Sequence, residues 1–165
     1  MVDITFKYSE YMGKAIRGYH HNSLRFWVSN GIGLAIVLLE IIMYSQNSNS
    51  RLLWIALFVI LALGASYAAS CYLQPSRFTS DPRYNKLFTL SVGDEKIQLN
   101  SEDLHSETDW NSVKKVWATD RFYYLFLDKR EFWVLPRDRF TDSAQEEQFK
   151  QIVSKHHPIN KGLIK

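Results

Sequence analysis

Residues 26–44 read FWVSNGIGLAIVLLEIIMY, and residues 52–73 read LLWIALFVILALGASYAASCYL. Neither stretch contains Lys, Arg or Asp, and only residues 45–51 separate them. A helix rises about 1.5 Å per residue, so roughly 20 apolar residues cross a bilayer core of about 30 Å. The two stretches therefore predict a transmembrane helical hairpin, with residues 26–44 and 52–73 as its spans and residues 45–51 as its loop.

Basic residues flank the hairpin unevenly. Those outside the loop are Lys7, Lys14, Arg17 and Arg25 before the first span, and Arg77, Arg83 and Lys86 after the second. The loop itself holds only Arg51. Loops rich in Lys and Arg stay in the cytoplasm. The sequence thus predicts a multi-pass protein with both termini in the cytoplasm and the loop outside.

Asn30 and Glu40 interrupt the first span. A polar or ionisable group inside a membrane is costly and is a functional hypothesis by default. Each of these residues lies about one helical turn from an end of the span, and interfacial anchoring is the favoured explanation for both. They are the candidate intramembrane polar residues of this chain.

Small residues gather in the cytoplasmic half of each span, around Gly31 and Gly33 in the first and over residues 62–70 in the second. Small residues allow membrane helices to approach closely. The pattern predicts that the two helices pack through these halves, with Ser66 or Ser70 near Asn30.

Residues 1–25 predict a cytoplasmic strand followed by an amphipathic helix. The apolar side chains of Val2, Ile4, Phe6 and Tyr8 alternate with polar ones, as in a half-buried strand. A lone strand is unstable in water, so this one is expected to pair with a sheet formed after the hairpin, on the same side of the membrane.

The helix that follows is expected to start with Ser9 as its cap. Its apolar face carries Tyr11, Ala15, Ile16 and Tyr19, and its basic side carries Lys14, Arg17 and His21. This amphipathic pattern predicts a helix lying at the inner headgroup region.

Residues 76–165 predict a small antiparallel β domain closed by a helix. The expected strands are residues 84–91, 96–100, 103–108, 113–119, 122–127 and 131–135. Ser143 and Glu146 form a capping box that starts a helix running to about Lys155, with Phe149, Ile152 and Val153 on the face that covers the sheet. The fold class is α+β: a two-helix hairpin with a pleckstrin-homology-like (PH-like) split barrel and a C-terminal helix.

Three features of this region are the Trp110 region leading into Val113–Trp117, the aromatic strand Phe122–Leu127, and Val134–Arg137 followed by Phe140 and the Phe149 helix. Together they resemble the YcxB-like family of bacterial membrane proteins. The resemblance implies a bacterial inner-membrane protein with two membrane helices and a C-terminal β domain. It implies no catalytic residues and no established activity.

No catalytic, cofactor or metal motif stands out, so the sequence predicts no enzyme and no cofactor. Residues 76–165 hold 15 basic and 14 acidic side chains, which argues against a nucleic-acid partner because such proteins need a strongly basic face. Six basic residues are candidate contacts for a partner protein or lipid: Lys114, Lys115, Lys129, Arg130, Arg137 and Arg139.

These observations favour a non-enzymatic inner-membrane protein whose cytoplasmic domain binds a partner protein or the membrane surface. One alternative is an immunity or envelope-protection protein that blocks a membrane-acting toxin. Another is a small channel or transporter subunit, which requires a homo-oligomer because two helices cannot enclose a pore.

Overall fold

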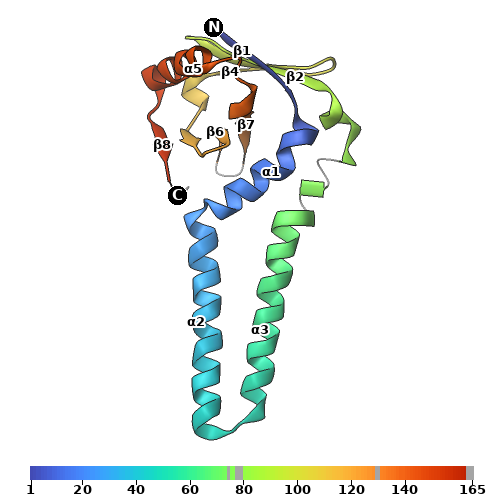
Figure 1. The fold of residues 1–165 in the computed structure, drawn as a ribbon, viewed down its shortest axis with the longest axis vertical. Coiled ribbons are helices and arrows are strands. Elements are labelled where there is room, and N and C mark those ends of the chain that lie inside the picture. The colour runs from blue at the N-terminus through green and yellow to red at the C-terminus, as the bar shows by residue number, and fades with distance from the viewer. Residues whose placement is uncertain (74, 77–79, 129–130, 163–165) are drawn as a thin grey trace.

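The two apolar stretches form a hairpin of long helices (Figure 1). The computed structural model describes residues 1–73, 75–76, 80–128 and 131–162 of the chain. In it, α2 spans Leu24–Asn47 and α3 spans Ser50–Ala68, with a π-helical turn at Ala69–Leu73 continuing α3. Both helices are long and apolar enough to cross a membrane.

The turn between α2 and α3 is shorter than the predicted loop of residues 45–51. Only Ser48 and Asn49 lie between the helices, and Ser48 reverses the chain in the left-handed conformation, with φ of 49°. The Asn49 side chain accepts a hydrogen bond from the backbone N of Arg51 at 3.1 Å and caps α3. The helices therefore extend beyond the apolar stretches that predicted them.

A single glycine brings α2 and α3 close together. Gly33 is buried, and a Cβ atom on it would lie 2.8 Å from the Leu63 side chain. A Cβ atom on Gly31 or Gly64 would meet no described neighbour within 4 Å. The predicted packing of small residues thus holds at Gly33 and does not extend to these other two glycines.

The N-terminal strand pairs across the hairpin with the domain that follows it. β1 (Val2–Lys7) lies antiparallel to β2 (Leu87–Val92), in a register from Val2 opposite Val92 to Lys7 opposite Leu87. This confirms the predicted pairing of the N-terminal strand with the distant sheet. Both ends of the hairpin consequently join one domain.

That domain contains two four-stranded sheets and a helix. The first sheet has the order β1-β2-β3-β4, with β3 at Lys96–Asn100 and β4 at His105–Asp109. The second has the order β7-β6-β5-β8, with β5 at Lys115–Ala118, β6 at Phe122–Phe126, β7 at Phe132–Pro136 and β8 at Ile159–Lys161. Helix α5 spans Ser143–His156. Strand β8, which pairs in parallel with β5, was not predicted.

Two predicted boundaries were wrong for local reasons. The strand expected from Tyr84 begins at Leu87, because Asp81 caps a short 3₁₀ turn at Pro82–Asn85. Helix α5 is capped by Asp142 and not by a capping box from Ser143, since the Asp142 side chain accepts a hydrogen bond from Gln145 N at 2.7 Å.

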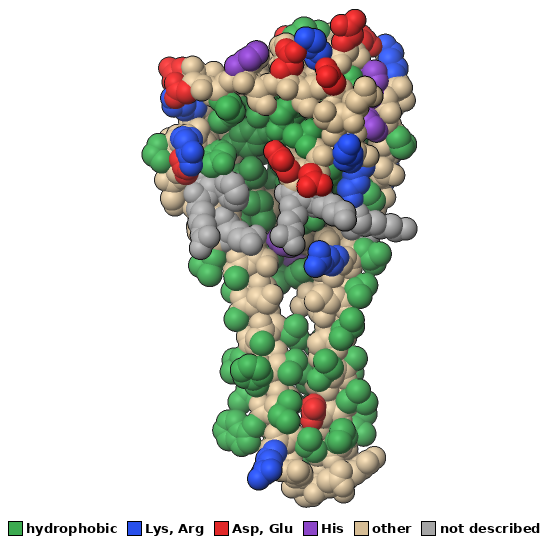
Figure 2. Space-filling model, turned by 180° about the vertical axis from the view of Figure 1, so that it is seen from behind, with side chains coloured by type: hydrophobic (Ala, Val, Ile, Leu, Met, Phe, Trp, Pro, Cys, Tyr) green, Lys and Arg blue, Asp and Glu red, His purple; other side chains and the backbone are tan. Residues whose placement is uncertain are grey.

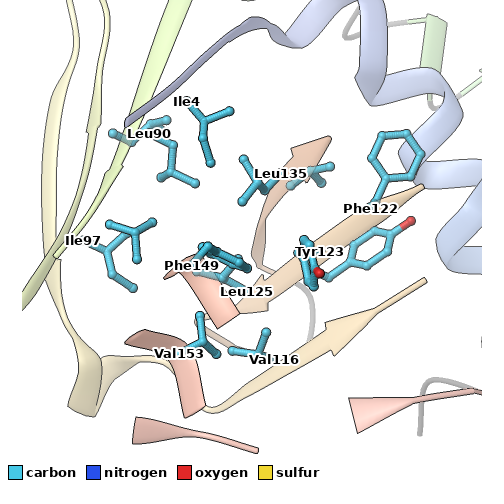
Figure 3. Close-up of a cluster of buried hydrophobic side chains, with 14 of the residues drawn as sticks. Ile4, Leu90, Ile97, Val116, Phe122, Tyr123, Leu125, Leu135, Phe149 and Val153 are labelled. Atoms are coloured by element: carbon cyan, nitrogen blue, oxygen red, sulfur yellow. The ribbon is translucent and has the colours of Figure 1, made fainter. Parts of the chain in front are cut away.

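The core lies between the two sheets and is closed by α5. Figure 3 shows Ile4 of β1 and Leu90 of β2 facing Leu135 of β7, with Phe149 of α5 among them. Phe149 and Val153 are fully buried, as expected for the face of α5 that covers the sheets. A strand from before the hairpin is therefore an integral part of the hydrophobic core.

Helix α1 (Tyr8–His21) connects this core to the hairpin. Its apolar face packs into the domain, where Tyr8, Tyr11 and Ala15 are buried within the core cluster. The predicted cap was wrong: Lys7, and not Ser9, holds the cap position, and the Ser9 hydroxyl donates to Asn85 Oδ1 at 3.2 Å.

Candidate functional site

A cationic pocket lies beside the end of α1 that joins the hairpin. Its volume is about 600 Å³. One wall is α1 and the following Asn22, and the opposite wall is the β5–β6 turn together with Arg137 and the end of β8. Its lining residues are Lys14, Arg17, Gly18, His21, Asn22, Ala118, Thr119, Asp120, Arg121, Phe122, Arg137, Lys161 and Gly162. We call this hollow the cationic pocket.

The positive charge of the cationic pocket is poorly compensated. Among the described residues, none of Lys14, Arg17, Arg121 and Lys161 has an acidic side chain within ion-pair distance. Within the described part of the chain, the only acidic side chain in its lining is Asp120, at the exposed β5–β6 turn. Elsewhere on the domain, several basic residues are matched: Lys96 pairs with Glu107, for example, and Lys155 with Asp94. The pocket therefore carries a net positive field.

Packing against the second sheet fixes the α1 wall. The buried Tyr124 hydroxyl donates to the backbone O of Ala15 at 2.8 Å. Gly18 allows this approach, because a Cβ there would lie 2.9 Å from the same hydroxyl. These contacts hold Lys14 and Arg17 on the side of α1 that faces the pocket.

A second attachment ties the start of α1 to the domain. The Arg139 guanidinium donates to Glu10 Oε2 at 2.9 Å and to the Tyr11 hydroxyl at 2.5 Å, and that hydroxyl donates to Asp138 Oδ2 at 3.2 Å. The bond to Tyr11 raises the pKa of Arg139. Helix α1 is thus fixed to the domain at both ends.

The opposite wall is equally well braced. Arg137 donates from its backbone N to Arg121 O at 2.9 Å and from Nη1 to Thr119 O at 3.1 Å, which fixes the β5–β6 turn. At the end of β8, Gly162 has a φ of 86°, and its carbonyl accepts a hydrogen bond from Trp117 Nε1 at 3.0 Å. These bonds hold the backbone of Arg121 and Lys161 in place while their side chains stay exposed.

Arg137 itself is committed to a structural ion pair. Its Nη2 lies 2.7 Å from Glu146 Oε1, which also accepts a bond from the Tyr123 hydroxyl at 2.6 Å. Burial raises the pKa of Glu146, but the bonds from Tyr123 and Arg137 outweigh it, and the net pKa is lowered. The Arg137–Glu146 pair fastens α5 to the second sheet.

The six basic residues predicted as contacts do not form one surface. Arg137 lines the cationic pocket but pairs with Glu146, and Arg139 is bound to α1. Lys114 is exposed, and Lys115 lies 4.7 Å from the centre of the Phe126 ring. Lys129 and Arg130 lie outside the described residues.

Sequence reasoning missed Arg121 and Lys161 as site residues. No local signal joins them, because they lie 40 positions apart and meet only through the parallel pairing of β8 with β5. Lys14, Arg17 and His21 were recognised as the basic side of α1, but not as the wall of a pocket.

An apolar groove of about 550 Å³ lies on the other side of α1. It is lined by Tyr8, Met12 and Ile16 of α1, by Phe132 and Trp133 of β7, and by residues of the first sheet and its loops. Figure 2 shows hydrophobic side chains gathered in a hollow of the domain above the hairpin. The two sides of α1 thus border hollows of opposite character.

The two polar residues of the first span differ in their surroundings. The Asn30 amide donates to Phe26 O at 2.8 Å within its own helix, so its donor is not directed to Ser66 or Ser70. Glu40 has one carboxylate oxygen, Oε2, that is buried without a hydrogen-bond partner among the described residues.

Comparison with known protein families gives a match for the middle of the domain. Residues 92–153 match the YcxB-like protein family. We refer to residues 92–153, by this similarity, as the YcxB-like segment. The match confirms the resemblance drawn from the sequence. It runs from the end of β2 into α5, and so contains the β5–β6 turn and Arg137 but neither α1 nor β8. The cationic pocket is therefore built between the YcxB-like segment and parts of the chain outside it.

Searches among curated proteins and among solved structures gave no match.

Proposed function

We propose that this chain is a non-enzymatic inner-membrane protein whose hairpin anchors a cytoplasmic, PH-like domain, and that the domain binds the anionic surface of the inner leaflet. The observation that carries the proposal is the cationic pocket, where four cations without ion pairs in the described structure border the junction of domain and hairpin. Near an anionic leaflet, each basic residue contributes about 1 kcal/mol.

The fold supports the proposed topology. Because β1 precedes the hairpin and β2 follows it, their pairing requires both ends of the hairpin to lie on one side of any membrane that it crosses. The excess of Lys and Arg at these ends favours the cytoplasmic side. The PH-like assignment is supported by two sheets closed by α5, with β1 as a strand supplied from outside the YcxB-like segment.

The position of the pocket supports a membrane-surface role. His21 and Asn22 line it and lie two to three positions before Leu24, the first residue of α2. The Trp27 indole donates to His21 O at 2.8 Å, and Trp is typical of the interface between headgroups and hydrocarbon. If α2 enters the bilayer near Trp27, the pocket opens at headgroup level.

Binding of a partner protein is the second candidate, and the apolar groove favours it. Trp133 and the exposed Leu104 lie in its lining. Exposed apolar patches on a domain surface mark interaction sites. Replacing these two residues with Ser is then expected to release a co-purifying protein, whereas the membrane-surface proposal expects no such loss.

The immunity and channel alternatives make separate predictions. Protection from a toxin predicts that expression rescues cells and that the hairpin alone retains this activity. A channel requires Asn30 or Glu40, so unchanged ion flux through reconstituted Asn30→Leu and Glu40→Leu variants would exclude it.

The membrane-surface proposal is tested by hydrogen exchange on the full chain in nanodiscs. One set contains only phosphatidylcholine, and the other also contains phosphatidylglycerol. Backbone amides of residues 118–122 are expected to exchange more slowly, by roughly fivefold or more, over the anionic lipid. High salt should remove the difference, since it screens charges at the membrane surface.

The turn at residues 93–95, which does not line the cationic pocket, is the internal control and should exchange equally in both sets. Equal exchange of residues 118–122 over neutral and anionic lipid would contradict the proposal.

A further inference from the structure

We propose that the cationic pocket is a binding site for a single phosphate group. The inference deepens the proposed function and rests on it in one respect: the inner leaflet is the expected source, as the phosphate of a lipid headgroup. A soluble phosphate compound offers the same chemistry, and the experiment below separates the two.

The charges in the pocket are arranged for an anion that the described residues do not supply. Arg17 and Lys14 approach from α1, and Arg121 and Lys161 approach from the opposite wall. Asp120, the acidic residue in the lining, is not within ion-pair distance of any of them. Like charges gathered in this way repel one another, and a bound anion relieves that repulsion.

The type of cation favours phosphate. Two of the four are arginines, whose planar guanidinium matches the spacing of phosphate oxygens with two parallel N–H donors. Arg17 is half-buried and lines the pocket, and its guanidinium also lies 5.9 Å from the centre of the Tyr72 ring, which is outside the pocket lining. Lys14 and Lys161 add point charges from either side.

Size and rigidity also suit a small ligand. A volume of about 600 Å³ falls within the usual range for small-molecule sites. Both walls are fixed by hydrogen bonds, through Tyr124 to Ala15 O and through Arg137 to Thr119 O. A site with preset walls loses little conformational freedom on binding.

The test uses the full chain purified in a neutral detergent. Glycerol 3-phosphate is titrated against chloride at equal ionic strength, with the melting temperature as readout. In parallel, chains extracted from mixed phosphatidylglycerol and phosphatidylcholine vesicles are examined by native mass spectrometry for retained lipid.

The test variant is Arg121→Gln with Lys161→Gln, since both side chains are exposed and neither forms an ion pair with a described residue. The control is Lys96→Gln with Lys155→Gln, which removes the same charge from cations that pair with Glu107 and Asp94 outside the pocket. The test variant is expected to weaken phosphate or lipid retention by roughly tenfold or more, and the control to leave it unchanged.

Retention of phosphatidylglycerol with weak glycerol 3-phosphate binding identifies the headgroup as ligand. Binding of glycerol 3-phosphate without lipid retention identifies a soluble phosphate compound. Either result supports the site. Absence of both, an equal effect of chloride, or unchanged binding in the test variant overturns it.

The outcomes separate this inference from the proposed function. If residues 118–122 are protected over anionic nanodiscs while the test variant binds normally, the pocket inference fails and the function stands. If glycerol 3-phosphate binds in detergent but hydrogen exchange of residues 118–122 is the same over neutral and anionic lipid, the phosphate site is supported and the membrane-surface function is contradicted.

Discussion

The hairpin and the domain place their large apolar side chains in opposite directions. In α3, Trp54 is 70% exposed and Phe58 is 72% exposed. In the domain, Tyr124 and Phe149 are both 0% exposed. The domain excludes water from its own core, whereas the hairpin turns its apolar surface outward and needs an apolar surrounding to cover it. Figure 2 shows the hydrophobic side chains along the outside of the hairpin.

Helix α1 lies at the boundary between the outward-facing apolar surface of the hairpin and the buried core of the domain. It is continuous with the hairpin through only Asn22 and Ser23, yet its apolar face packs within the domain core. The orientation of the domain relative to the hairpin thus depends on how firmly α1 is held. Equivalent changes on the two sides of this boundary are therefore expected to have different effects.

The largest difference is expected for the same truncation in the two regions. Phe149→Ala leaves a cavity in a fully packed core and should lower the free energy of unfolding of the domain by about 3–5 kcal/mol. Phe58→Ala removes an exposed ring and should change it by less than about 0.5 kcal/mol. Chemical unfolding in detergent micelles, followed by tryptophan fluorescence, measures both. Equal effects would show that the hairpin has a core of its own.

A second pair of variants tests how closely α2 and α3 approach. Gly33→Val forces a side chain against Leu63 and should destabilise the helix pair by about 1–3 kcal/mol. Gly31→Val carries the same change in helix propensity but meets no described neighbour within 4 Å. Thermal unfolding monitored by helical circular dichroism should separate the two, and matching curves would rule out Gly33 as the contact point.

A third pair of variants tests whether the domain or the hairpin holds α1 in place. Tyr124→Phe removes a buried bond of 2.8 Å to Ala15 O and should cost about 1 kcal/mol, the usual net contribution of one hydrogen bond, because Ala15 O keeps its acceptor role within α1. Tyr67→Phe removes only a 3.4 Å contact between α3 and His21, and should cost less. Hydrogen exchange of α1 amides measures both effects. Faster exchange in Tyr67→Phe than in Tyr124→Phe would mean that the hairpin, and not the domain, fixes α1.

The smallest expected effect is a dependence of domain stability on pH. The net pKa of Glu146 is lowered from 4.5, so its contribution is present above about pH 4.5 and is lost as pH falls through the lowered value. Glu146→Gln should therefore be less stable than the natural chain at pH 7 and lose less stability on acidification. Urea unfolding between pH 7 and 3 tests this, and parallel curves for the two proteins would contradict it.

The sequence predicted the hairpin and the pairing of β1 with the distant sheet because both depend on strong periodic patterns. Uninterrupted apolar runs give the helices, and alternation from Val2 to Tyr8 gives the strand. The pairing of β1 with a sheet beyond the hairpin then followed from the inferred topology.

The cationic pocket could not be predicted in the same way. Lys161 lies on a strand of three residues, too short for any pattern, and that strand pairs in parallel with β5 across the intervening chain. Arg137 and Arg139 looked like free surface cations, but Glu146 and Glu10 neutralise them only in the folded chain. Which cations lack a partner is a property of the tertiary structure.

The central proposal is that strands from before and after a membrane hairpin form one cytoplasmic domain. Thr5 and Thr89 lie opposite each other in β1 and β2, with their hydroxyls 3.0 Å apart. Thr5→Cys with Thr89→Cys, in a Cys71→Ser background, places two thiols at a separation suited to a disulfide. A protease recognition site inserted between Ser48 and Asn49 then allows added protease to cleave the hairpin turn.

When protease is added outside intact spheroplasts, the turn should be cleaved. The two fragments should then run as one species without reductant and separate when reductant is added. Cleavage only after the membrane is opened, or fragments that separate without reductant, would contradict the claim.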